Sequence, residues 1–203
     1  MGVSFLFIAC GKTLGTNEPE SYTIKVMEHK TNTPLSGVTV SLYRCTNYDL
    51  VFGCQGKAKF ATYTTNSKGE AVIPDNDYNK ANEGIVLSRS QYWEIQGGQG
   101  DNYMLPEALA RLTLKASKNY PDTTMLDIMT EGDFGIKSIL TIKAPKDSVA
   151  DFRMIGNASN IIRWIAYPRM PPCIFYCPRD TLAVGSIVLS AQKFETVSST
   201  INY

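Results

Sequence analysis

The residues that could do acid–base or nucleophilic chemistry are few and scattered along this chain. It has a single histidine, His29, placed among turn-forming residues, where a lone imidazole without partners has little chemistry to do. The carboxylate pairs Asp75/Asp77 and Glu131/Asp133 lie in expected turns, where solvated acids are common. Serines are plentiful, but no strand-to-helix nucleophile elbow surrounds one. We therefore expect no catalytic residues, although two opposed acids of a glycosidase remain an alternative that sequence leaves open.

Cysteine is the residue type with the most informative spacing. Four of the five cysteines form two local pairs, Cys45 with Cys54 and Cys173 with Cys177. Short-range pairs of this kind predict disulfides, which persist in an oxidising compartment such as the periplasm or the cell surface. Closing the first loop would stabilise the fold by about 2–3 kcal/mol. Free thiols and a four-thiolate zinc site are the alternatives, but neither pair has C-x-x-C spacing, and we expect no metal or other cofactor.

The fifth cysteine follows a short apolar block. Residues 3–9 are apolar except for Ser4 and end in Ala9, Cys10 comes next, and residues 11–20 are polar and flexible. This resembles the end of a bacterial lipoprotein signal peptide, in which the cysteine after a small residue is acylated. The resemblance implies lipidation of Cys10, a signal segment and tether over residues 1–20 with cleavage before Cys10, and an outer-membrane location. The basic segment that opens a signal peptide is missing. The alternative is a first β-strand with a buried free cysteine.

Composition limits the classes of function. The chain has 203 residues, 43% hydrophobic and 19% charged, with a formal net charge of +1. These are ordinary globular values, and the balanced charge gives no support for nucleic-acid binding. No apolar run reaches the roughly 18 residues that a membrane-spanning helix needs. We expect a membrane to be reached only through the lipid.

Residues 22–74 carry the fold signature. Apolar and polar residues alternate in runs beginning at Tyr22, Val38 and Phe60, with turn formers between them and a long loop expected between Cys45 and Cys54. Residues 34–40 read Pro-Leu-Ser-Gly-Val-Thr-Val, and residues 64–71 read Thr-Thr-Asn-Ser-Lys-Gly-Glu-Ala. With these two motifs the chain resembles the carboxypeptidase regulatory-like, or transthyretin-like, family. The resemblance implies an antiparallel Greek-key β-sandwich that serves as an accessory module.

One branch of that family consists of hydrolases of purine breakdown, and this chain departs from it. Those enzymes use several histidines, an arginine and a C-terminal Tyr-Arg-Gly-Ser. Here there is one histidine, and the nearest match, residues 43–46 (Tyr-Arg-Cys-Thr), lies mid-chain. The resemblance therefore implies the fold without the enzymatic activity.

The rest of the chain predicts a second all-β unit. After an Asx-rich turn at residues 75–79 and strands at 84–88 and 90–96, a glycine-rich run at 96–102 predicts a hairpin tip or a hinge. Residues 104–203 show strand-length apolar alternation six times, with Trp164 expected in a core. We expect one domain over 21–103 and a second β-sandwich-like domain over 104–203. The second half also resembles the C-terminal part of uncharacterised bacterial lipoproteins, through residues 156–160 and 194–203.

Two apolar loops are the candidate binding surfaces. Tyr48, Leu50 and Phe52 lie between the first cysteine pair, and Ile174, Phe175 and Tyr176 lie between the second, within a proline-rich stretch. Such loops either present a contact surface for an envelope protein or a glycan, or fold back to cap the ends of the sandwiches. The sequence favours a lipid-anchored binding or structural module of the cell envelope. A subunit of a fimbrial or adhesin-type surface assembly is the alternative.

Overall fold

The computed structural model describes residues 20–131, 137–143, 147–168 and 181–203. Cys10, Asp133, Cys173, Ile174, Phe175, Tyr176 and Cys177 lie outside the described residues. The expectations that concern them therefore stay predictions.

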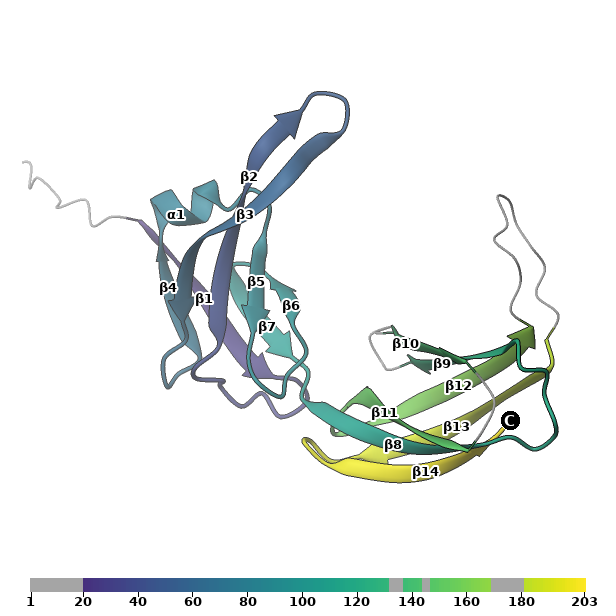
Figure 1. Ribbon diagram of the computed structural model, residues 1–203. Helices are drawn as coiled ribbons and strands as arrows, with labels where there is room; N and C mark the ends of the chain where they lie inside the picture. Colours follow the sequence, from purple (N-terminus) through teal and green to yellow (C-terminus); the bar gives the residue numbers. More distant parts are fainter. Residues whose placement is uncertain (1–19, 132–136, 144–146, 169–180) are drawn as a thin grey trace, which may run out of the picture.

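The described chain is almost entirely β, as the alternation predicts, and forms two β-sandwiches in sequence (Figure 1). The elements of the first half are β1 (Ser21–Glu28), β2 (Thr39–Asp49), β3 (Gly53–Thr64), β4 (Glu70–Pro74), α1 (Asp75–Lys80), β5 (Ile85–Ser88), β6 (Ile95–Gly97) and β7 (Gly100–Met104). The elements of the second half are β8 (Glu107–Lys115), β9 (Thr124–Glu131), β10 (Lys137–Lys143), β11 (Ser148–Ile155), β12 (Ala158–Pro168), β13 (Ala183–Ala191) and β14 (Thr196–Asn202).

The first sandwich packs sheet β4-β1-β7 against sheet β3-β2-β5-β6. Strands β1 and β7 are parallel, and the other pairs in these two sheets are antiparallel. Inward-facing aliphatic side chains fill the space between the sheets, among them Ile24, Val40, Leu42, Ile73 and Leu87, each fully buried. The glycine-rich run at 96–102 forms neither a hairpin tip nor a hinge between the sandwiches. It carries the chain from one sheet, at β6, to the other, at β7.

The second sandwich packs sheet β10-β9-β12-β13 against sheet β11-β8-β14. Its core is separate from the first and contains Leu112, Leu126, Ile128 and Ile162. Trp164 also lies in this core, with 8% of its surface exposed, so the expectation of a core tryptophan is confirmed. Alternation with period two predicts six strands in this half and its described residues form seven, and the pattern arises because a strand with one face on the core buries every second residue.

The two sandwiches meet at a small junction. Glu28, at the end of β1, is 1% exposed, and its carboxylate accepts hydrogen bonds from Lys193 Nζ at 3.0 and 3.1 Å and from Tyr92 Oη at 2.6 Å. The Tyr92 ring meets Phe194 edge-on, with ring centroids 5.5 Å apart. Beside them, Trp93 Nε1 donates to the Met154 carbonyl at 3.2 Å. Residues from both halves therefore hold the sandwiches together.

Gly69 lies at a position in the first sandwich that has no room for a side chain. Its φ is +76°, and a Cβ there would lie 2.5 Å from the Val26 carbonyl oxygen. Gly37 has a similar φ of +71°, but a Cβ added to it would meet nothing within 4 Å. Gly37→Ala should lower the free energy of unfolding by about 1–2 kcal/mol, the cost of a left-handed backbone for alanine. Gly69→Ala should cost about 1–3 kcal/mol more, because the backbone must also shift.

Urea unfolding of the two glycine variants checks this prediction. The pair is matched, since both replacements add one methyl group at positive φ and only one adds a collision. Equal losses at both positions would contradict it.

Candidate functional site

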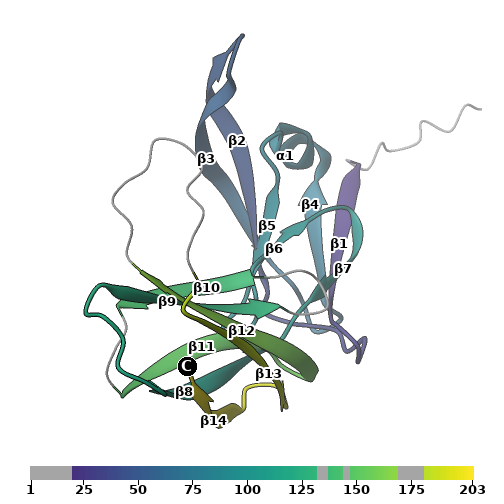
Figure 2. The ribbon, with the colours of Figure 1, turned by 90° about the vertical axis from the view of Figure 1, so that its right-hand side faces the viewer.

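The most unusual feature of the surface is the hairpin of β2 and β3. In Figures 1 and 2 it extends well beyond the rest of the first sandwich, away from the second. Thr39–Leu42 of β2 pack on the core, whereas the strand beyond Leu42 and its partner leave it. The loop expected between Cys45 and Cys54 is therefore wrong, because both cysteines lie in paired strands and only residues 50–52 form the turn.

The tip of this hairpin exposes large apolar side chains. The exposed fractions are 71% for Tyr48, 95% for Leu50, 82% for Val51 and 77% for Phe52. The alternative that these side chains fold back and cap the sandwich is wrong, because a capping side chain would be buried. Exposed apolar side chains gathered at one place are uncommon on a soluble surface and mark contact sites.

Side chains at the base of the turn form hydrogen bonds with its backbone groups, although the turn is exposed. The Asp49 carboxylate accepts hydrogen bonds from the backbone N–H groups of Val51 and Phe52, at 2.8 and 2.9 Å. The hydrogen bond from the Phe52 N–H, followed by the one from the Val51 N–H, holds the pKa of the Asp49 carboxyl below its usual range. Gln55 Nε2 donates to the Phe52 carbonyl at 3.0 Å, and Gly53 takes the left-handed φ of 72° that closes a three-residue turn. The apolar tip is thus held in one shape by local hydrogen bonds.

A disulfide between Cys45 and Cys54 joins the two strands behind the tip. The Cα atoms are 5.7 Å apart, and the strand register shifts beside Cys45, between Cys45 and Asn47 and again before Tyr48. This part of the sequence-based prediction is confirmed. The bond holds the strands together in a part of the hairpin whose side chains are half-buried or exposed and do not pack in the core.

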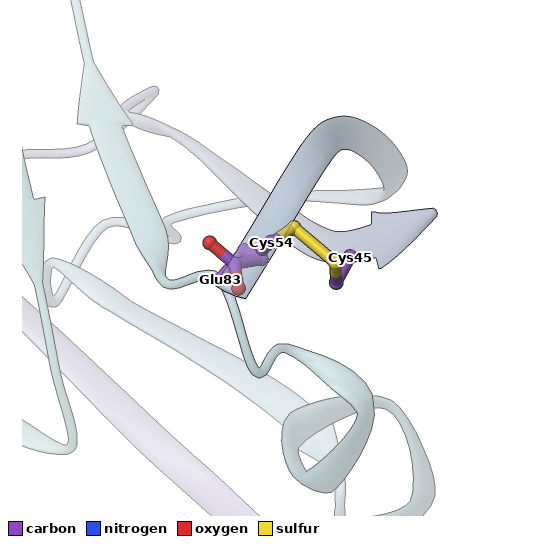
Figure 3. A group of neighbouring side chains, drawn as sticks. All are labelled: Cys45, Cys54 and Glu83. Atoms are coloured by element: carbon purple, nitrogen blue, oxygen red, sulfur yellow. A yellow bond between two sulfur atoms is a disulfide. The ribbon is translucent and has the colours of Figure 1, made fainter. Parts of the chain in front are cut away.

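Glu83 lies against this disulfide (Figure 3). One oxygen of Glu83 and the two sulfur atoms all lie within 4.8 Å of one another. Because the sulfurs are bonded to each other, they do not offer thiolates to a metal ion. The neighbouring Asn82 Oδ1 accepts a hydrogen bond from the Cys45 backbone N–H at 3.0 Å, which ties the hairpin base to the segment before β5.

Cations surround the middle of the hairpin. Arg44 lies over the ring of Phe60, 5.6 Å from its centroid, and Lys57 Nζ lies 4.9 Å from the centroid of Tyr43. Lys59 is paired with Tyr43 across the strands, and all three cations are exposed. Sequence reasoning missed these residues as site residues. The sequence feature that could have identified them is that they lie on both sides of the apolar segment, Arg44 before it and Lys57 and Lys59 after it.

The other residues singled out from the sequence lie elsewhere. Asp75 and Asp77 fall in the first turn of the six-residue helix α1, where an Asx-rich turn was expected, and Tyr63 donates to Asp77. Glu131 pairs with Arg163 Nε at 3.2 Å. His29 is half-buried at the end of β1 and meets the ring of Tyr103 edge-on, with centroids 6.5 Å apart.

An open hollow of about 640 Å³ lies where the two sandwiches meet, lined mostly by polar side chains. Lys30 Nζ, on its wall, donates to the Asn157 carbonyl at 3.2 Å and is thus engaged across the junction. Ligand sites are mostly apolar clefts with a few polar groups, so this hollow is a poor match for one.

Among the described residues, no helix is long and apolar enough to cross a membrane.

Comparison with known proteins gives little further information. No protein-family model matches the sequence, and no curated protein matches it. Among solved structures, the chain is similar to GBS52, the minor pilin of the Gram-positive pathogen Streptococcus agalactiae, with 12% identity and a TM-score of 0.31 over 90% of this chain and 94% of that one. A streptococcal ancillary pilin matches with 10% identity and a TM-score of 0.31 over 91% of this chain and 63% of that one. TM-scores this low establish neither a shared fold nor a shared function.

Proposed function

We propose that this chain is a non-catalytic, lipid-anchored module of the bacterial cell envelope that binds a partner through the β2–β3 hairpin. The observation that carries the proposal is the hairpin tip, where four large apolar side chains are more than two-thirds exposed on a turn fixed by a disulfide and by Asp49. A rigid turn loses little conformational entropy on binding, so apolar contact at the tip translates into affinity.

The anchor part of the proposal depends on Ala9 and Cys10, which match the lipidation motif. Acylation there would hold the domains expected over residues 21–103 and 104–203 at the membrane through the polar tether of residues 11–20. Metabolic labelling with a fatty acid should mark the wild-type chain, and Cys10→Ser should abolish the label. An unlabelled wild type would remove the anchor from the proposal.

The binding part is tested with isolated cell envelopes of the bacterium that expresses the chain. The full chain carrying Cys10→Ala, which removes the anchor, should bind them, and adding Leu50→Ser and Phe52→Ser should weaken binding at least about tenfold, since two buried apolar side chains are worth about 1.5–3 kcal/mol each. The matched control carries Ile139→Ser and Val149→Ser instead. Ile139 on β10 is 60% exposed and Val149 on β11 is 63% exposed, and both are far from the hairpin in sequence. If the hairpin variant bound as well as the control, the binding proposal would fail.

A second candidate function, a subunit of a surface assembly, rests on strand β13. This strand is an edge of its four-stranded sheet in the described part of the chain, and it exposes Val184 and Val188. Open edges pair with strands of other chains. Size-exclusion chromatography with crosslinking tests it: concentration-dependent oligomers that a Val188→Lys variant loses would support assembly, and a strict monomer at high concentration would count against it.

A further inference from the structure

We infer that the tip of the β2–β3 hairpin inserts into the surface of a lipid bilayer that carries anionic headgroups. The inference rests on the proposed function and names the partner of the same hairpin. Its four supports are the shape of the tip, its backbone hydrogen bonding, the distribution of charge behind it, and the end of the sandwich from which it projects.

The tip has the composition of a membrane wedge. Leu50, Val51 and Phe52 form the turn, and Tyr48 precedes them with an amphipathic ring suited to the headgroup level. The turn is the narrow end of a projecting hairpin (Figure 1), and all four of these side chains are more than two-thirds exposed. A projecting wedge needs a medium that closes around it, which the acyl boundary of a bilayer does.

Three of the six backbone N–H and C=O groups of Leu50, Val51 and Phe52 have partners within the hairpin, which lowers the cost of moving the tip out of water. An N–H or C=O group entering an apolar phase must already have its hydrogen bond. The N–H groups of Val51 and Phe52 donate to Asp49 Oδ1, and the Phe52 carbonyl accepts from Gln55. Asp49 carries its charge at the base of the turn, so it limits the depth of insertion to the three turn residues and stays at headgroup level.

The charges behind the tip favour anionic lipid. The strands carry three exposed cations, Arg44, Lys57 and Lys59, against the single carboxylate of Asp49. Glu83, beside the disulfide, adds one carboxylate from outside the hairpin. Consecutive strand residues point to opposite faces, so Arg44, and Lys57 across from Cys45, put cations on both faces of the hairpin. We call these three cations, Arg44, Lys57 and Lys59, the collar. Cations on both faces of the hairpin suit a planar charged surface that the hairpin enters end-on, whereas a protein groove would favour cations on one face.

The position of the collar also fits. Lys57 lies five residues after Phe52, the last residue of the turn, which is about 17 Å at the rise of an antiparallel strand. A tip buried about 5–10 Å into the headgroup–acyl boundary leaves such a lysine, with its flexible side chain, within reach of phosphates. The collar and the tip can therefore act at once.

The hairpin projects from the end of the first sandwich at which the described chain enters. Glu20 lies there, its carbonyl accepting a hydrogen bond from the Asp75 N–H at 2.9 Å at the start of α1. Figures 1 and 2 both show this entry and the hairpin at the end far from the second sandwich. A chain anchored through Cys10 would therefore present the hairpin toward the membrane that holds it.

Flotation with protein-free vesicles tests the inference. The full chain carrying Cys10→Ala should float with vesicles of phosphatidylcholine plus phosphatidylglycerol, and less with phosphatidylcholine alone. Adding Leu50→Ser and Phe52→Ser should reduce binding at least about tenfold, because the transfer of two large apolar side chains is lost. Replacing Lys57 and Lys59 by alanine should reduce binding to the anionic vesicles about fivefold per cation. This reduction should occur in low salt only, since salt screens the attraction between the cations and the headgroups.

The controls separate this inference from the proposed function. The Ile139→Ser, Val149→Ser variant should float like its parent, and a Phe52→Trp reporter should shift its emission to shorter wavelength on anionic vesicles. Absence of flotation, or flotation that ignores the tip substitutions, overturns the inference. If hairpin-dependent binding to cell envelopes persists in that case, the partner is a protein or glycan and the proposed function survives.

Discussion

Replacing Trp164 by alanine is expected to lower the free energy of unfolding by about 3–5 kcal/mol, the range for a large aromatic removed from a core. Trp164 lies on β12 within the second core and is 8% exposed. Its cross-strand partner on β13 is Gly185, and a Cβ there would lie 2.2 Å from Cζ2 of the indole. The ring therefore lies directly over the glycine. Its removal opens a cavity and uncovers an edge strand. Urea unfolding followed by circular dichroism measures the loss.

A double-mutant cycle with Gly185→Ala shows whether this contact is the cause. In the wild type the added methyl group should destabilise the fold, because it collides with the indole. In the Trp164→Ala background the same methyl group meets empty space and should be neutral or stabilising, which gives a coupling energy of about 1–3 kcal/mol. Gly98→Ala, with nothing within 4 Å of the added methyl, is the control and should leave the coupling at zero. Additive losses for Trp164 and Gly185 would contradict the contact.

The sequence predicted the strands best where one face is buried. Val38, Val40 and Leu42 alternate because the core selects every second residue, and the same holds for Leu112 and Leu114 on β8. Beyond Leu42 the hairpin has no core beneath it, so its strands show no period, and the sequence pattern predicts a loop there. Backbone pairing and the Cys45–Cys54 disulfide hold these strands instead.

Local composition misled in two short segments. Residues 75–80 contain Asp, Asn and Tyr, which are poor helix formers, yet they form α1, with Asp75 and Asp77 in its first turn and Tyr78 stacked on Tyr22 at 4.1 Å. The strand expected over 90–96 is reduced to β6 (Ile95–Gly97), because Tyr92 and Trp93 turn to the junction between the sandwiches. Tertiary contacts decide both cases, and no local pattern encodes them.

Of the candidate site, only the apolar residues of the hairpin tip could be predicted from the sequence. Cysteines flanking Tyr48, Leu50 and Phe52 marked a constrained apolar segment, but whether it faced solvent depended on where the strands end. The partner of Glu28 was out of reach of sequence reasoning, since Lys193 lies 165 residues away and neither residue belongs to a motif.

Glu28→Gln is expected to lower the free energy of unfolding at neutral pH by about 1.5–3 kcal/mol, the value of hydrogen bonds to a charged group. Burial by itself would raise the pKa of Glu28, but hydrogen bonds from Tyr92, Lys193 and Thr31 outweigh it and hold the pKa below the ordinary 4.5. The folded state then binds the proton more weakly than the unfolded state. The contribution is complete above about pH 4.5 and is lost as the pH falls through the folded-state pKa.

The stability that Glu28→Gln removes should therefore be largest at neutral pH and should decrease as the pH falls. Urea unfolding of wild type and Glu28→Gln over a series of pH values should give two curves that lie apart at neutral pH and converge below about pH 4.5, because the glutamine has no proton to bind. Glu94→Gln, which removes an exposed carboxylate from the same half, should stay within about 0.5 kcal/mol of wild type throughout. Lys193→Met leaves Glu28 buried with one partner fewer, so it should cost stability at neutral pH and little below the folded-state pKa. Parallel curves for wild type and Glu28→Gln would mean that the carboxylate is not held by its charge, and that apolar contacts such as Tyr92 with Phe194 carry the junction alone.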